Sequence, residues 1–230
     1  MINSLTILML VMLSSIGDQN FNSGNSNCSS FYSYPDVVYN STVQSLALKD
    51  TTVKFLWCDK RYNEELQDTV NSIFINEDYC KTMTDPERAA LGFVATFIGN
   101  ECWWDEEAKD DRSNLKCKIL TALNLGYQCS DQHLGFLRKW FRKDKESIEK
   151  LEDCPTTPYT STIQDTFEEI KLTVKENIIS VSFIANGINL REQRKWSWSE
   201  TDYFQFEDEQ IRIIKIDKSE VKVEHFKFGE

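Results

Sequence analysis

The chain has 230 residues, of which 40% are hydrophobic and 27% are charged. These proportions are typical of an ordinary globular protein and exclude a collagen-like, low-complexity or mostly disordered chain. Its 37 acidic residues outnumber its 26 lysines and arginines, which gives a net charge of −11. Such a chain repels nucleic-acid phosphates and anionic lipid surfaces, so we expect neither as a partner.

Residues 1–17 have the features of a cleaved signal peptide. Their apolar core, residues 5–13, is followed by small residues that suit cleavage before Asp18. This core is shorter than the roughly 18 residues that span a bilayer, so no membrane span is expected. We therefore predict an exported protein, periplasmic or secreted, with a polar tether over residues 18–35. A buried N-terminal helix or strand is the alternative.

Seven cysteines follow this leader, and cysteines normally pair in an oxidising compartment. We expect three disulfides and assign the odd thiol to Cys28. Short loops favour pairing Cys102 with Cys117 and Cys129 with Cys154. No C-x-x-C spacing occurs and the chain has only two histidines, so we expect no metal site, redox motif or cofactor. The candidate disulfide residues are Cys58, Cys80, Cys102, Cys117, Cys129 and Cys154.

Between residues 59 and 152 the apolar side chains recur at helical spacing. The first stripe runs from Tyr62 to Phe74, and Asp59 is its expected N-cap. The sequence Thr84-Asp85-Pro86-Glu87 is a capping box that starts a second helix. Later stripes lie at residues 115–123, 134–141 and 148–151. We predict about four to five helices, stapled by disulfides into a domain over residues 36–154.

The pattern changes after Cys154, where prolines mark a linker over residues 155–165 and the apolar period becomes two. Asn186-Gly187 is the strongest hairpin signal in the chain. We expect about six antiparallel strands over residues 166–230, forming a meander that closes into a small barrel or packs on the helices. The predicted fold class is therefore α+β, a helical domain followed by an antiparallel β-meander.

The segment from Glu101 to Asp111 joins two adjacent tryptophans to a dense acidic run. Such a segment suits a basic cleft on another protein, because tryptophan supplies contact area and carboxylates steer association. The alternatives are carboxylate catalysis on a sugar by Glu101 and Asp105, or a plain solvated connector. The candidate partner-binding residues are Trp103, Trp104, Asp105, Glu106, Glu107, Asp110 and Asp111.

A second aromatic group consists of Trp196, Trp198, Phe204 and Phe206, which we expect on two neighbouring strands, meeting across a hairpin. Sheet core is the simpler interpretation of this group, and a ligand cavity is the alternative. We interpret His133 as a solvated residue at a helix start and not as a catalytic base.

The sequence favours an exported, non-enzymatic protein-binding module, such as a periplasmic inhibitor or immunity protein. Its expected partner is a toxin or hydrolase with a basic cleft, since the chain is acidic and carries no recognisable nucleophile motif. The alternatives are a β-barrel that binds a small apolar ligand and a hydrolase that uses carboxylates alone.

Overall fold

The computed structural model describes residues 48–99, 115–154 and 163–227. The strands in these ranges are β1 (Thr51–Asn63), β2 (Asp68–Ile75), β3 (Ile163–Lys175), β4 (Ile178–Asn189), β5 (Arg194–Glu207), β6 (Gln210–Lys218) and β7 (Lys222–His225). The helices are α1 (Glu77–Thr82), α2 (Asp85–Phe97), α3 (Leu115–Ala122), α4 (Asp131–Trp140) and α5 (Lys145–Glu152). The expected signal peptide and tether lie outside the described residues.

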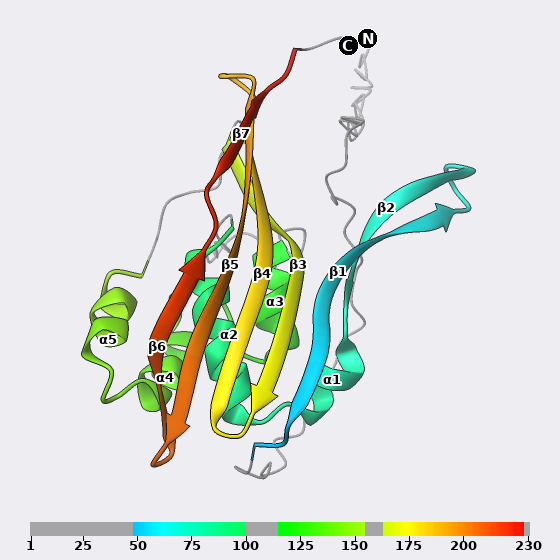
Figure 1. The fold of residues 1–230 in the computed structure, drawn as a ribbon. Helices are drawn as coiled ribbons and strands as arrows, with labels where there is room; N and C mark the ends of the chain where they lie inside the picture. The colour runs from blue at the N-terminus through cyan, green and yellow to red at the C-terminus, as the bar shows by residue number, and fades with distance from the viewer. Residues whose placement is uncertain (1–47, 100–114, 155–162, 228–230) are drawn as a thin grey trace, which may run out of the picture.

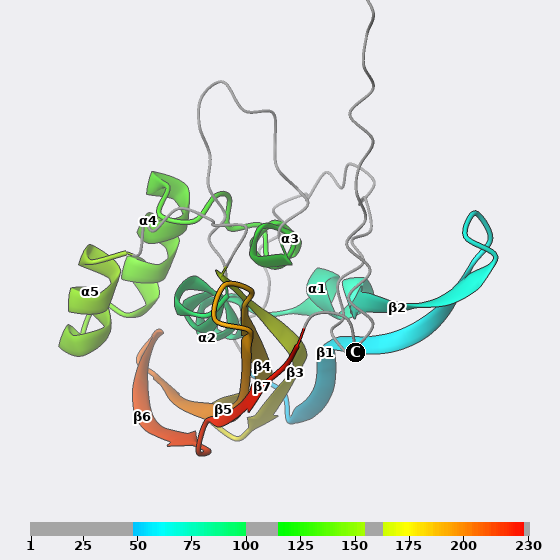
Figure 2. The ribbon, with the colours of Figure 1, turned by 90° about the horizontal axis from the view of Figure 1, so that it is seen from above.

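All of these strands belong to one antiparallel sheet with the order β2-β1-β3-β4-β5-β6 (Figure 1). The last strand, β7, pairs with the Arg194 end of β5, beyond the stretch that β6 occupies. The sheet is curved, and the helices lie on its concave side (Figure 2). The β1–β2 hairpin extends past the rest of the sheet as an arm.

The core lies between the concave face and α2. This helix is apolar on nearly every side, which is typical of a helix covered all round. The ring centroid of Phe93 in α2 lies 4.6 Å from that of Phe141 and 6.3 Å from that of Phe204 in β5. The helices therefore bury their apolar faces against the sheet.

The predicted separation into a helical domain and a later meander is wrong. The segment from Tyr62 to Phe74 forms the β1–β2 hairpin, and β1 pairs with β3 across the expected boundary. Two members of the expected helical stripe, Tyr62 and Leu66, are 55% and 57% exposed, so this stripe is not a core face. Pairing of β1 with β2 across a short turn has overridden a spacing that suits a helix equally well.

The hairpin predicted at Asn186-Gly187 is also wrong, because β4 continues through it to Asn189 and the chain turns over residues 190–193. The stretch after residue 166 consequently contributes the long β3, β4 and β5 with β6 and β7, and β5 is one strand from Arg194 to Glu207. The four aromatic residues of the second group therefore lie along one strand and not across a hairpin.

Helices α2 to α5 follow their predicted signals. The Thr84–Glu87 capping box is present, and the Ser130 side chain accepts a hydrogen bond from the His133 backbone N–H at the start of α4. Gly126 follows α3 with a φ of 76°, a left-handed conformation that glycine adopts without strain. These signals were readable because each is made within a few consecutive residues.

The predicted Cys129–Cys154 disulfide is confirmed, with the two Cα atoms 5.9 Å apart. Cys58 and Cys117 are also disulfide-bonded. Cys80 is not: its thiol is free and buried in α1, and burial raises its pKa to about 12. Including Cys80 among the bridged residues was therefore wrong. Cys28 and Cys102 lie outside the described residues.

One irregularity shapes the edge of the sheet. Between Phe204 and Tyr203 the β5–β6 register skips Ile214, which is an extra residue on β6. The carboxylate of Asp144, the N-cap of α5, accepts a hydrogen bond from the Ile213 backbone N–H beside this bulge, at 2.9 Å. A helix N-cap thus holds the bulged strand in place.

Among the described helices, none combines the length and the apolar character needed to cross a membrane.

Candidate functional site

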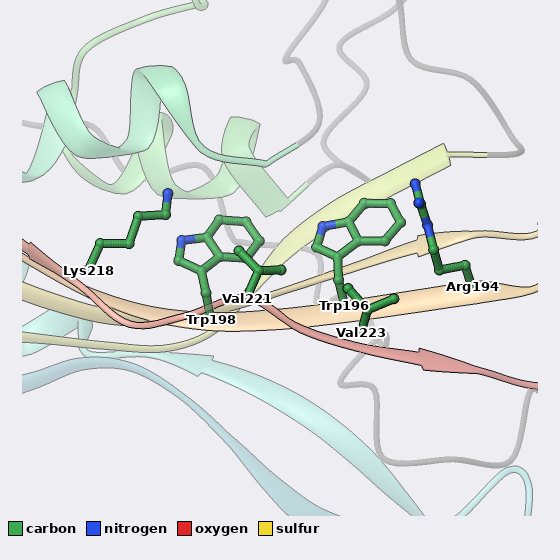
Figure 3. A pocket seen from close by; sticks show the side chains of 6 residues that line it. All are labelled: Arg194, Trp196, Trp198, Lys218, Val221 and Val223. Atoms are coloured by element: carbon green, nitrogen blue, oxygen red, sulfur yellow. The ribbon is translucent and has the colours of Figure 1, made fainter.

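A pocket of about 380 Å³ lies on the sheet at the Arg194 end of β5. Tryptophans of β5 form its centre, and β7 and the end of β6 supply the neighbouring walls (Figure 3). The lining residues are Arg194, Trp196, Trp198, Lys218, Val221 and Val223.

The pocket continues a row of side chains that begins in the core. Alternate residues of a strand share a face, so Trp196 and Trp198 lie on the same face of β5 as Phe204 and Phe206. Phe204 is fully buried beneath α2, and the ring of Phe206 lies 6.3 Å from that of Trp140 in α4. The tryptophans stand at the other end of this row, and Figure 3 shows both indoles pointing to the same side of the strand.

Small residues of β4 make room for the indoles. Gly187 pairs with Trp196 and Ala185 pairs with Trp198. A Cβ added at Gly187 would overlap both the Trp196 indole and the Asp165 carboxylate. The Trp196 indole and the Asp165 carboxylate lie side by side over this glycine, and burial raises the pKa of Asp165, an effect that Trp196 and Lys116 oppose. Gly187, which the sequence suggested as part of a turn, therefore lies directly beneath the Trp196 indole.

A cation lies against each indole. The Arg194 guanidinium is 5.5 Å from the Trp196 ring centroid, and the Lys218 ammonium is 5.1 Å from that of Trp198. Both distances fall within the range of a cation–π attraction. Figure 3 shows the order along the pocket as Arg194, Trp196, Trp198 and Lys218. Each cation also has an acidic partner, Glu192 at 3.2 Å for Arg194 and Glu200 at 2.8 Å for Lys218.

An acidic pair separates the pocket from the core. Glu200 and Asp202 follow Trp198 on the same face of β5, and Asp202 is only 6% exposed. Burial raises the pKa of Asp202 to about 7, with a further contribution from the neighbouring Glu200, while Lys150 and Lys218 oppose the shift. Asp202 therefore keeps its proton below neutral pH, because burial and a neighbouring acidic group both disfavour its charged form.

Several buried polar atoms in this region have no hydrogen-bond partner within the part of the chain that the structure describes. They include Nε of Arg194, Nε1 of Trp198 and Oδ1 of Asp202. An unsatisfied buried polar atom costs about 1–3 kcal/mol, so such atoms are uncommon unless a site uses them. Nε of Arg194 and Nε1 of Trp198 are donors that belong to pocket-lining residues.

The sequence identified only part of this region. Trp196 and Trp198 line the pocket, whereas Phe204 lies in the core; Phe206 packs against the core, as Trp198 also does. Sequence reasoning missed the two cations and the valines that line the pocket with them. The alternation of Arg194 with Trp196 and Trp198 could have placed Arg194 on the same face of the strand. Lys218, Val221 and Val223 could not be placed in this way, because strand pairing brings them to the pocket. The acidic segment 101–111 lies outside the described residues.

His133 is not a solvated helix-start residue, as the sequence suggested, but is fully buried. Its Nδ1 accepts from the Cys129 backbone N–H at 3.0 Å. The Thr96 hydroxyl donates to the Gly92 carbonyl at 2.7 Å, so Nε2–H of His133 donates to Thr96 Oγ1, 3.0 Å away. Burial lowers the pKa of His133 to about 4, and the nearby Lys116 adds to this shift. His133 is therefore a neutral structural residue.

Within the described ranges, no group of three or more histidine, cysteine, aspartate or glutamate residues is placed to hold a metal ion. Comparisons with known protein families, with curated proteins and with solved structures give no match to this chain. What the pocket does is therefore inferred from its residues.

Proposed function

We propose that this protein is an exported binding protein that takes up a small ligand in the Trp196/Trp198 pocket without chemically changing it. The observation that carries this proposal is the pair of indoles held at the centre of the pocket. Gly187 leaves space for one indole, and Arg194 and Lys218 flank the pair. Two tryptophans held in this way offer a large rigid contact area at a low cost in side-chain entropy.

The exposed apolar surface beside the indoles supports the same proposal. Val221 and Val223 are 49% and 52% exposed, and both line the pocket. Apolar side chains clustered around a concavity with a few polar groups are the usual surroundings of a small ligand.

The acidic pair is poorly placed for catalysis at this pocket. Neither Glu200 nor Asp202 lines it, and Glu200 is bound to Lys218. A general acid or base must lie within hydrogen-bond reach of the reacting atoms. The proposal therefore assigns the lining residues to binding alone.

Export is part of this proposal. The Cys129–Cys154 disulfide supports it, because stable disulfides form mainly in oxidising compartments. The mass of the mature protein tests it: cleavage before Asp18 is the expected result, and an intact leader in purified native protein would contradict export.

Binding is tested by titrating the mature protein with a broad small-molecule panel while its tryptophan emission is recorded. A saturable change is expected in the wild type and in a Trp57→Phe control, since Trp57 stacks on Phe74 in the β1–β2 hairpin. A double Trp196→Ala, Trp198→Ala variant should bind at least about tenfold more weakly, as expected for loss of aromatic anchors. Equal affinity of the double variant and the wild type would place binding elsewhere.

A second candidate function is the inhibition of a toxic hydrolase through an acidic surface, as an immunity protein would provide. The net charge of −11 favours it, since it would steer the protein toward a basic cleft. Native mass spectrometry of protein purified from its own cells tests this function, with a stoichiometric protein partner as the supporting result. Reversing the charge of Asp105, Glu106 and Glu107 to lysine should then slow association with that partner.

A further inference from the structure

The shape of the pocket restricts the kind of ligand that it can hold. Its two indoles are neighbours on one face of a strand, where side chains repeat about every 6.6–6.8 Å. They form a shelf, and the valines beside them keep about half of their surface exposed. A lipid chain requires apolar contact around most of its surface. A ligand on this shelf has one apolar face and remains in contact with water on another.

The charged groups beside the indoles restrict the kind of ligand further. The Arg194 guanidinium and the Lys218 ammonium place donors at the two ends of the shelf, so a ligand that spans it should present acceptors there. Glu200 and Glu192 place acceptors beside the same ends, because they pair with Lys218 and Arg194. A carboxylate ligand would meet repulsion there, whereas a hydroxyl group both donates and accepts.

The electrostatics of the indoles agree with these requirements. The face of an aromatic ring carries partial negative charge, which attracts C–H groups that carry partial positive charge. A sugar ring has such C–H groups on one face and hydroxyls around its rim. We infer that the ligand of the Trp196/Trp198 pocket is a carbohydrate whose rings pack on the two indoles. This inference rests on the proposed binding function and names the ligand class for it.

The hydroxyl groups of the carbohydrate would form hydrogen bonds at the two ends of the shelf. At one end, Lys218 and Glu200 present a donor and an acceptor next to the indole N–H of Trp198. At the other end, Arg194 presents its guanidinium beside the Trp196 ring, next to the Glu192 carboxylate. An oligosaccharide of two or more rings contacts both ends, whereas a monosaccharide contacts one.

The test uses the full mature chain with three kinds of probe. They are an array of neutral, amino and acidic oligosaccharides, oleate as a lipid chain, and benzoate as a small aromatic acid. Any array hit is measured again in solution by isothermal titration calorimetry. We expect saturable binding of at least one oligosaccharide, with weaker binding of its monosaccharide and no binding of oleate or benzoate.

Variants locate the site. Trp196→Ala and Trp198→Ala should each weaken oligosaccharide binding about tenfold, while Trp57→Phe leaves it unchanged. Trp198→Phe keeps an aromatic face but with a smaller ring, so it should fold normally and weaken binding by a smaller factor. This variant keeps the test decisive if an alanine variant fails to fold.

The outcomes separate the ligand class from the proposed function. Binding of oleate or benzoate at the tryptophans, with no array hit, would overturn the carbohydrate inference and leave the binding function standing. Oligosaccharide binding that all tryptophan variants retain would place the carbohydrate elsewhere and overturn the inference. Failure of every probe in both this experiment and the broad panel would overturn both proposals.

Discussion

The two ends of β5 carry the same aromatic pattern on the same face of one strand, yet they meet different surroundings. At one end Phe204 lies fully buried beneath α2. At the other end Trp196 and Trp198 line a pocket with half-exposed valines. The covering element, and not the alternation itself, thus decides whether an aromatic row becomes core or binding surface.

Replacing an aromatic side chain by alanine should show the largest difference in stability between the two ends of β5. Phe204→Ala removes a ring that contacts Phe93 and Phe141, so we expect a loss of about 3–5 kcal/mol in the free energy of unfolding. Trp198→Ala should cost less, because its side chain is only partly buried and its N–H has no partner to lose. Urea denaturation of both variants measures the difference, and equal losses would mean that the tryptophan end is also core.

The pH dependence of stability distinguishes the buried His133 from the buried Asp202. Burial lowers the pKa of His133 to about 4 from 6.5, so its contribution is present above pH 6.5 and is lost as the pH falls toward 4. The pKa of Asp202 is raised to about 7 from 3.8, so its contribution is present below pH 3.8 and is lost as the pH rises toward 7. Between pH 4 and 6.5 the two slopes oppose each other.

Single variants should reveal each slope. Asp202→Asn leaves the His133 slope alone, so its free energy of unfolding should fall by up to about 3 kcal/mol between pH 6.5 and 4, more than in the wild type. His133→Gln should show the reverse, with stability falling as the pH rises from 4 to 7. Urea titrations across this range measure both profiles. An Asp202→Asn profile parallel to that of the wild type would show that Asp202 is already ionised in the folded protein.

A matched pair of glycine substitutions tests the floor of the pocket. Gly187→Ala adds a methyl group that overlaps Trp196 and Asp165, and it should cost about 1–3 kcal/mol and shift the tryptophan emission. Gly135→Ala, in α4, meets no atom within 4 Å and should stabilise the protein by about 0.5–1 kcal/mol. Thermal unfolding and emission spectra compare the two, and an unperturbed Gly187→Ala would mean that the indole does not lie over β4.

The helices were predictable and the first hairpin was not, for a physical reason. The capping box at Thr84 and the cap at Ser130 are made within four consecutive residues, so local sequence carries the whole signal. The β1–β2 hairpin joins the rest of the sheet through Thr51 to Leu56 of β1, which pair with β3 more than a hundred residues later. The apolar spacing from Tyr62 to Phe74 suits a helix as well as a strand, and local sequence cannot choose between them.

The candidate site shows the same division. The aromatic residues of β5 were visible in the sequence, but their neighbours were not, because Lys218 and Val223 reach them through the pairing of β6 and β7 with β5. Gly187 misled the prediction, since an Asn-Gly pair usually marks a turn. Here its missing side chain matters for packing, because an indole occupies the space where a Cβ would lie.

The bulge at Ile214 determines the charge of the pocket. With this extra residue, Lys218 lies opposite Glu200 and reaches the Trp198 ring. In an unbroken register Asp217 would take that place, and two carboxylates would face each other beside the indole. A shift of one residue in the register of this edge strand would therefore replace Lys218 by Asp217 and reverse the charge of one pocket wall. Ligand preference in such a protein can diverge through the register of β6, which the Asp144 cap of α5 helps to hold.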